Sequence, residues 1–150
     1  MNSVTLPAIP SSVPLLVESV IDAAKKSGLN QTAQLDIQLA AEEMIVNIVN
    51  YAYPDQPGMI LLETFILGGD RPGLRIRISD HGKSFNPISM LDPEIDVPLA
   101  ERRIGGLGIF IAKEKADRFF YECRNDTNIL VMEKFLSGKS HTKKNDYKEH

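Results

Sequence analysis

The chain has 150 residues, 43% of them hydrophobic and 25% charged, and this length suits a single domain with one core. With 17 basic against 20 acidic side chains the formal net charge is -3, which argues against general nucleic-acid binding because that function usually shows as a basic excess. The single cysteine, Cys123, excludes an internal disulfide framework. No apolar run approaches the roughly 18 residues that span a bilayer, and the first residues lack a signal-peptide pattern. We therefore expect a soluble, cytoplasmic protein with no contact to membrane or nucleic acid.

The first predicted element is a short edge strand at 3–9, because its β-branched residues are bounded by prolines. Ser11 and Ser12 stand before Pro14, which fits a helix N-cap followed by an early proline. Apolar residues at helical spacing then continue as far as Gly28. We therefore predict a first helix that ends at this glycine.

A second, longer helix is predicted from about 32 to 52 and is ended by Pro54. Two strand-like stretches follow at 59–67 and 74–79. The second stretch alternates strictly, so we expect one of its faces to be buried and the other to expose its arginines. The glycine-rich segment 68–73 between them indicates a hairpin-like loop.

Residues 81–103 contain several prolines and show no sustained period, and a loop of this length in a small domain is more often functional than a plain connection. A third helix is predicted from 108 to about 116, followed by strands at 118–123 and 128–135. Residues 137–150 contain one aromatic and no aliphatic side chain, so we predict that they are disordered.

Helices and strands in this order predict an α+β fold with two layers. Strands joined by short loops favour antiparallel pairing, and the helices are expected to pack on one face of the sheet. We therefore predict a two-layer α/β sandwich whose sheet is mixed but mostly antiparallel, in one domain at 1–136.

The predicted long helix carries a polar stripe that has apolar residues on both sides. Glu43 and Asn47 are four residues apart, so their side chains project one turn apart into the same space, and Asp36 and Asn50 belong to the same stripe. A carboxylate beside an amide oxygen can hold a hard divalent cation together with water and phosphate oxygens. Alternatively, the carboxylate can accept a proton from a hydroxyl group, or the pair can be an ordinary exposed one, because this spacing is common by chance. The apolar residues on the far side of the stripe are Leu35, Leu39 and Val46.

Asp80 lies at the end of an apolar strand, with Gly82 two residues later and Phe85 after it. A carboxylate at a strand end, beside a glycine that lets a ligand approach the backbone, can accept a hydrogen bond from an exocyclic amine, and the aromatic ring can close over an apolar pocket. The same residues also fit an ordinary turn. A P-loop is excluded, since its earlier glycine would have to stand where Arg77 stands.

Three glycines, Gly105, Gly106 and Gly108, stand directly before an apolar helix. Such a backbone can turn its N–H groups toward an anion, assisted by the positive end of the helix, and Arg102 and Arg103 add positive charge at the loop exit. The alternative is a glycine-rich turn that lets the helix pack closely. A cation-binding helix face, an amine acceptor and a glycine anion cradle together indicate an adenine nucleotide site with Mg²⁺.

Three segments, 42–54, 79–87 and 104–110, resemble in order and spacing the N, G1 and G2 boxes of the GHKL (Bergerat-fold) ATPase superfamily. Within it they look like the boxes of the anti-sigma-factor serine kinases, the RsbW-like ATP-binding proteins. The similarity extends from about 4 to 136. It implies a Bergerat ATP-binding fold that uses ATP and Mg²⁺.

The resemblance implies a role for each matching position. Asn47 would ligate Mg²⁺, and Glu43 would be the general base that takes a proton from a serine or threonine hydroxyl of a partner protein. Asp80 would bind the adenine amino group, to which Gly82 gives access, and residues 87–103 would form a lid. The remaining implied nucleotide-binding positions are Asn50, Phe85, Arg102, Arg103, Gly105, Gly106, Leu107, Gly108, Ile109 and Thr127.

The family pattern implies an ATP-dependent protein serine/threonine kinase that is also an anti-sigma factor in a partner-switching pathway. It would sequester a sigma factor and phosphorylate an anti-anti-sigma antagonist, thereby releasing that antagonist. Relatives often pair as homodimers, and no feature of this sequence decides between a homodimer and a monomer. The alternative is a non-catalytic ATP-binding module that sequesters a regulatory protein, in which the nucleotide only tunes a binding surface. The retained Glu43 favours the kinase.

Overall fold

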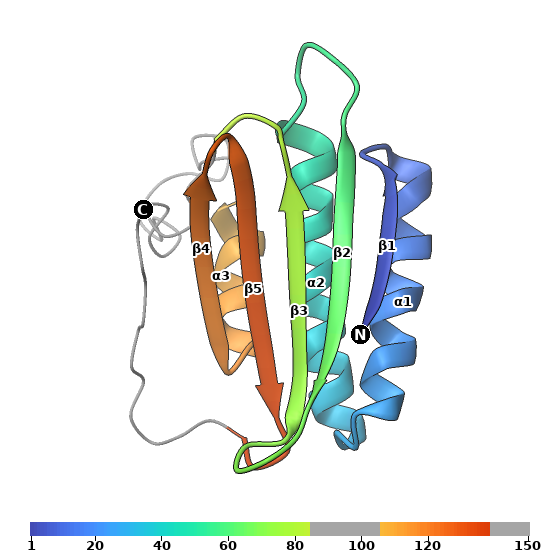
Figure 1. The fold of residues 1–150 in the computed structure, drawn as a ribbon, viewed down its shortest axis with the longest axis vertical. Coiled ribbons are helices and arrows are strands. Elements are labelled where there is room, and N and C mark those ends of the chain that lie inside the picture. The colour runs from blue at the N-terminus through green and yellow to red at the C-terminus, as the bar shows by residue number, and fades with distance from the viewer. Residues whose placement is uncertain (85–105, 139–150) are drawn as a thin grey trace.

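The computed structural model describes residues 1–84 and 106–138, and within them helices cover one face of a single sheet (Figure 1). In chain order the elements are β1 (Asn2–Pro7), a 3-10 turn η1 (Pro10–Ser12), α1 (Val13–Lys26), α2 (Gln31–Tyr51), β2 (Met59–Leu67), β3 (Gly73–Asp80), α3 (Gly106–Lys115), β4 (Arg118–Arg124) and β5 (Thr127–Phe135). This arrangement confirms the predicted two-layer α+β fold. None of the described helices is both long and apolar enough to cross a bilayer.

The sheet has five strands in the order β1-β2-β3-β5-β4, and every pairing between them is antiparallel. The sequence prediction allowed a mixed sheet, but the described strands contain no parallel pair. Hairpins join β2 to β3 and β4 to β5, whereas a parallel pair needs a crossover of about a dozen residues or more. The register places Asp80, the last residue of β3, between Ile60 of β2 and Asn128 of β5.

The first turns of α1 and α2 differ in detail from the prediction. Ser12 does occupy the N-cap of α1, but its side chain makes no capping hydrogen bond, and η1 precedes it. At α2 the Asn30 side chain accepts a 2.8 Å hydrogen bond from the backbone N–H of Ala33, so the helix begins at Gln31. This cap satisfies one of the N–H groups that a first helical turn leaves unpaired. The spacing of apolar residues does not show where such a cap lies, so it could not predict this helix start.

The glycine-rich segment enters α3 earlier than predicted, since the helix begins at Gly106 rather than Gly108. Ile109 and Ala112 are fully buried, and α3 packs against α2. Burial of this apolar face offsets the low helix propensity of glycine.

Alternate residues of the strands face the helices and form the core, as their alternation predicted. On β3, Leu74, Ile76 and Ile78 are buried, whereas Arg75 is exposed on the opposite face. The buried residues that α2 contributes to the core are Ile37, Ala40, Ala41, Met44 and Ile45. The core thereby holds α2 across the sheet, with its last turns over the end of β3.

An ion-pair cluster fixes the opposite end of the sheet. The Lys134 ammonium donates a 2.7 Å hydrogen bond to the carbonyl oxygen of Lys115, the last residue of α3, and lies 3.3 Å from carboxylate oxygens of Asp36 and Asp117. Asp117 also accepts a 2.8 Å hydrogen bond from the N–H of Phe135. These contacts tie the start of α2 and the ends of α3 and β5 together.

Candidate functional site

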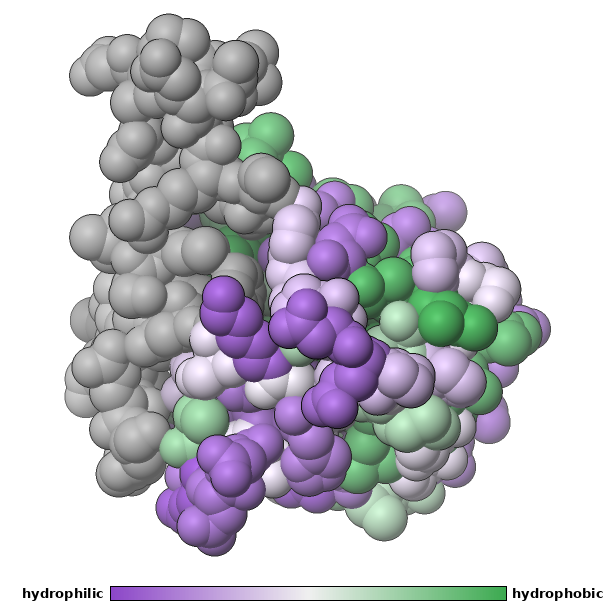
Figure 2. Space-filling model, turned by 90° about the horizontal axis from the view of Figure 1, so that it is seen from above, coloured by the Kyte–Doolittle hydropathy of each residue, from purple (hydrophilic) through white to green (hydrophobic). Residues whose placement is uncertain are grey.

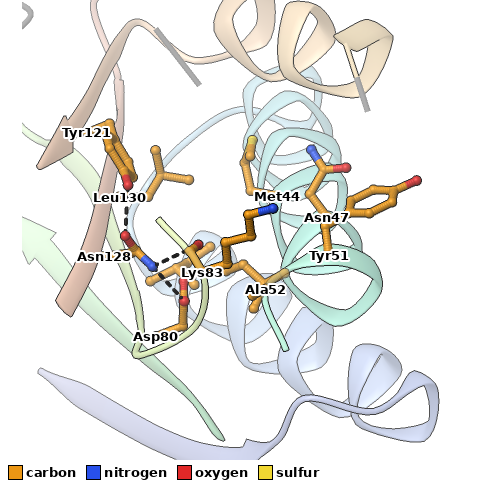
Figure 3. Close-up of a pocket in the computed structure, with 11 residues that line it drawn as sticks. Met44, Asn47, Tyr51, Ala52, Asp80, Lys83, Tyr121, Asn128 and Leu130 are labelled. Carbon is orange, nitrogen blue, oxygen red and sulfur yellow. Dashed lines mark hydrogen bonds between the residues drawn. The ribbon is translucent and has the colours of Figure 1, made fainter. Parts of the chain in front are cut away.

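A hollow lies where the second half of α2 meets the end of β3 and the start of β5 (Figure 3). The empty space in it, its open mouth included, is about 430 Å³, and side chains from α2, β3, β4 and β5 line it. Asn47 from α2 and Asp80 from β3 both line it, so two of the sequence-predicted pieces converge as expected. Its apolar walls are Met44, Ile48, Ala52, Ile78 and Leu130.

Asp80 is buried at one end of the hollow. Its Oδ1 accepts hydrogen bonds from the backbone N–H of Gly82 (2.8 Å) and from the side-chain amide of Asn128 (2.9 Å), while none of the described residues donates to Oδ2. Burial raises the pKa of the Asp80 carboxyl above its ordinary value, and the two hydrogen bonds and nearby His81 act in the opposite direction. Oδ2 is therefore an acceptor in an apolar surrounding, which suits the amine donor of a flat heterocycle.

Two residues that the sequence analysis missed, Asn128 and Tyr121, hold Asp80 in place (Figure 3). The Tyr121 hydroxyl donates a 2.8 Å hydrogen bond to Asn128 Oδ1, which turns the Asn128 amide nitrogen toward Asp80. The same nitrogen lies 3.2 Å from the carbonyl oxygen of Gly82. The signal that finds Asn128 is the antiparallel register, because β5 places it directly opposite Asp80.

Thr127, which was predicted as a nucleotide-binding position, does not line the hollow, whereas its neighbour Asn128 does. Its hydroxyl lies 3.2 Å from Nδ1 of His81 on a more exposed part of this edge. Neighbouring residues of a strand point to opposite faces of the sheet, so Asn128 rather than Thr127 faces the hollow. The structure thus adds Asn128 to the lining of the hollow, and the nucleotide contact at Thr127 stays a prediction.

Asn47 is buried on the side of α2 that faces the hollow, and its amide nitrogen has no hydrogen-bond partner among the described residues. A buried polar group without a partner costs about 1–3 kcal/mol, so this side chain is placed for a ligand rather than for folding. Its amide oxygen suits Mg²⁺, which keeps several water and phosphate ligands and needs few from the protein. The unpartnered amide N–H suits an acceptor such as a phosphate oxygen, while the amide oxygen is the atom that could reach a cation; the described residues hold no cluster of three or more histidine, cysteine or acidic side chains.

Asn50, which the polar stripe placed near Asn47, is exposed and does not line the hollow. Three residues along a helix rotate a side chain by about 300°, which carries Asn50 to the side of Asn47 that faces away from the hollow. Tyr51, four residues after Asn47, does line it. Asn50 therefore takes no part in the lining of this hollow, and its nucleotide contact stays a prediction.

Glu43 lies one turn before Asn47 and faces the first turn of α3. A Cβ atom built on Gly108 would come within 2.6 Å of Glu43 Oε2, so the missing side chain of this glycine makes room for the carboxylate. The N–H groups of a first helical turn have no partners within the helix and can point at an anion. The glycine segment and Glu43 are thus neighbours, beside the hollow rather than in its lining.

The remaining positions predicted around these glycines differ in their surroundings. Leu107 is exposed, whereas Ile109 is fully buried in the core, which leaves only its backbone N–H for a nucleotide. Four predicted site residues and the predicted lid at 87–103 lie outside the described residues, as does most of the predicted tail. These four residues are Phe85, Arg102, Arg103 and Gly105.

Gly82 is required for packing as well as for access to Asp80. A Cβ atom there would collide with Ala52 at the end of α2, and the N–H of Lys83 donates a 2.6 Å hydrogen bond to the carbonyl oxygen of Ala52. The Lys83 side chain extends across the hollow toward α2 (Figure 3). It had no assigned role in the sequence analysis, yet it brings a positive charge to the mouth of the hollow, where it suits a phosphate.

The end of the molecule that carries the hollow is seen from above in Figure 2. Hydrophilic side chains gather at the centre of this end, whereas hydrophobic ones are exposed toward the side of α1 and β1 (Figure 2).

A carboxylate acceptor between apolar walls, a buried carboxamide one turn from a carboxylate and a glycine-containing helix start thus lie at the same end of the molecule. The chain belongs to the histidine kinase-like ATPase domain family, whose family model matches residues 6–134. The resemblance to GHKL ATPases is thereby confirmed, and the antiparallel sheet with helices on one face is consistent with their fold.

Individual relatives agree with this assignment. The chain is 31% identical over 137 residues to the serine-protein kinase RsbW of Halalkalibacterium halodurans, covering 88% of this chain and 81% of the relative. It is 26% identical over 132 residues to the serine-protein kinase RsbW of Oceanobacillus iheyensis, covering 85% and 80%. It is also 28% identical over 97 residues to the serine/threonine-protein kinase BtrW of Bordetella bronchiseptica, covering 64% and 66%.

Proposed function

We propose that this protein is an ATP-dependent protein serine/threonine kinase and an anti-sigma factor that acts in the cytoplasm on an anti-anti-sigma antagonist. The relatives named serine-protein kinase support the class of reaction. The observation that carries the proposal is the close approach of Glu43 to Gly108. Glu43 itself lies one helical turn before the buried Asn47 on α2. This carboxylate is half-buried beside the first turn of α3, the helix start that would hold the phosphates.

Each described residue of the site has a task in nucleotide binding. Asp80 Oδ2 accepts a hydrogen bond from the adenine amino group, while Asn128 and Gly82 hold Oδ1. The apolar walls contact the faces of the base. Asn47 provides an oxygen for Mg²⁺, which supplies charge neutralisation on the phosphate oxygens when it is bound. Lys83 offers a further positive charge at the mouth.

The chemical step is the transfer of the γ-phosphoryl group to a serine or threonine hydroxyl. The hydroxyl oxygen forms a bond to the γ-phosphorus as the bond from that phosphorus to the bridging oxygen breaks, and ADP leaves. The hydroxyl proton passes to the Glu43 carboxylate, which stands within reach of the surface. Phosphoryl transfer needs positioning and charge stabilisation more than covalent catalysis, so this set of groups suffices.

The product explains the switch between partners. A phosphorylated side chain carries about 1.5 to 2 negative charges, and it would be formed next to the Glu43 carboxylate. Repulsion between them weakens the complex, so the phosphorylated antagonist leaves and the protein is free to hold its sigma factor.

Purified protein mixed with Mg²⁺, [γ-³²P]ATP and its antagonist should label a serine or threonine of the antagonist. Glu43→Gln should lower the rate by about 10²–10⁴-fold, because a general base is lost, while ATP still raises the melting temperature. If the antagonist is regulated as well by Glu43→Gln as by the wild type, the protein is instead a non-catalytic ATP-dependent binding module. If ATP produces no thermal shift in the wild type, the nucleotide site itself is wrong.

A further inference from the structure

The outer side of the helix layer exposes a row of large apolar side chains. Leu35 and Leu39 on α2 are 57% and 36% exposed, and Leu107 at the start of α3 is 53% exposed. Val46 on α2 is half-buried. Single exposed leucines need no explanation, but these four side chains gather in one region and are referred to as the apolar collar.

The apolar collar lies beside Glu43, on the side of α2 that faces away from Asn47. Leu39 is four residues before Glu43 and Val46 is three residues after it, so both neighbour it on the surface of α2. Leu107 precedes Gly108, whose Cβ position lies 2.6 Å from Glu43 Oε2. Apolar side chains from two helices therefore stand next to the same carboxylate.

The nucleotide does not account for this surface. The hollow is lined by the side of α2 that carries Asn47, Ile48 and Tyr51, and no member of the apolar collar is among its lining residues. Leu35 lies two turns before Glu43, further still from the residues that line the hollow. Among the described residues, the collar therefore has no part in the hollow.

We propose that the apolar collar is the docking surface for the segment of the antagonist that carries its phosphoacceptor, and that apolar residues flank the acceptor serine or threonine there. This inference rests on the proposed kinase function. A general base must come within about 2.6–3.2 Å of the hydroxyl it deprotonates, so the acceptor has to sit directly on Glu43. The residues on either side of the acceptor then cover the first turns around Glu43, which are the turns that carry the collar. Burial of its leucines provides the binding energy that places the hydroxyl.

The test compares the double variant Leu35→Gln/Leu39→Gln with the wild type. Glutamine has nearly the helix propensity of leucine, and both positions are exposed, so the fold is expected to be kept. The matched control is Leu15→Gln, an equally exposed leucine (54%) on α1. The substrate in the assay is the purified antagonist, identified as the protein that accepts ³²P from [γ-³²P]ATP when the wild-type chain is present.

The expected result for the double variant is a KM for the antagonist that rises about tenfold or more. For the double variant, kcat at saturating antagonist and the thermal shift by ATP should stay within about twofold of wild type. For Leu15→Gln, the KM for the antagonist, kcat and the thermal shift should all stay within about twofold of wild type. Leu39→Met should keep most of the affinity that Leu39→Gln loses, because methionine keeps the apolar volume.

Other outcomes overturn the inference. An unchanged KM for the double variant, or an equal rise for Leu15→Gln, shows that the antagonist docks elsewhere while the kinase proposal stands. A loss of ATP-induced stabilisation in the double variant shows that the collar is covered by the nucleotide or by another part of this chain. If no protein accepts phosphate, or if Glu43→Gln transfers as well as wild type, the kinase proposal fails and the docking surface fails with it.

Discussion

Gly108→Ala tests whether the position of Glu43 matters for phosphoryl transfer. The added methyl group would lie 2.6 Å from Glu43 Oε2, whereas ordinary contacts of a Cβ atom are 3.4–4 Å. The carboxylate oxygen therefore has to withdraw by about 0.8 Å, and it can do so because Glu43 is only half-buried. The backbone N–H of residue 108 remains, so binding of the phosphates should change little.

The expected magnitude follows from this displacement. A misplacement of about 1 Å in a reacting group can lower a rate by about 10²-fold, and we expect a loss of that order in kcat. Alanine favours a helix interior over glycine by up to about 1 kcal/mol, so the variant should be no less stable than the wild type. A slow but stable enzyme is therefore the predicted phenotype.

The assay is the initial rate of ³²P transfer at saturating antagonist and ATP, with thermal unfolding measured in parallel with and without ATP. Gly68→Ala is the matched control, because nothing lies within 4 Å of a Cβ atom at that position. It should transfer phosphate at the wild-type rate. If Gly108→Ala folds, binds ATP and retains a rate within about threefold of wild type, the placement of Glu43 against α3 is irrelevant to catalysis and its role as the base is refuted.

Two further predictions concern stability. Burial raises the pKa of Asp80 above 3.8, so the folded protein takes up this proton at a higher pH than the unfolded chain, and the free energy of unfolding falls as pH rises through that window. Asp80→Asn should therefore be more stable than wild type without nucleotide at about pH 7, with the gain shrinking toward about pH 4, and should lose stabilisation by ATP. Lys134→Met removes the cation beside the Asp117 side chain, which is 1% exposed, and should cost about 3–5 kcal/mol in urea unfolding.

Each of these predictions has its own check. If Asp80→Asn is equally or less stable at about pH 7, burial of the Asp80 charge is not a cost to the fold. For the lysine, the control is Lys115→Met. The Lys115 side chain is 45% exposed and its ammonium lies 3.7 Å from Asp36, so this variant should cost only about 0–1 kcal/mol. Equal losses for Lys134→Met and Lys115→Met would contradict the view that the buried pair alone ties the elements together.

The comparison of sequence and structure is clearest at the ends of elements. The glycine segment was predicted to precede a helix at Gly108, but tertiary burial of Ile109 draws Gly106 into α3. At β5 the prediction selected Thr127, whereas the strand turns Asn128 toward Asp80. Successive side chains of a strand point to opposite faces of the sheet. The residue that lies opposite Asp80 therefore cannot be identified until the partner strand and its register are known.

By itself the sequence determined those features that depend on local covalent geometry. The spacing of Glu43 and Asn47 places them one turn apart on any helix, and the alternation of β3 decides which of its residues are buried, because helical and strand periods are properties of the backbone. Only the tertiary structure decided that Asn128 and Tyr121 hold Asp80, and that Gly108 makes room for Glu43. These contacts join segments far apart in the chain, and they exist only because packing of the helices on the sheet brings the segments together.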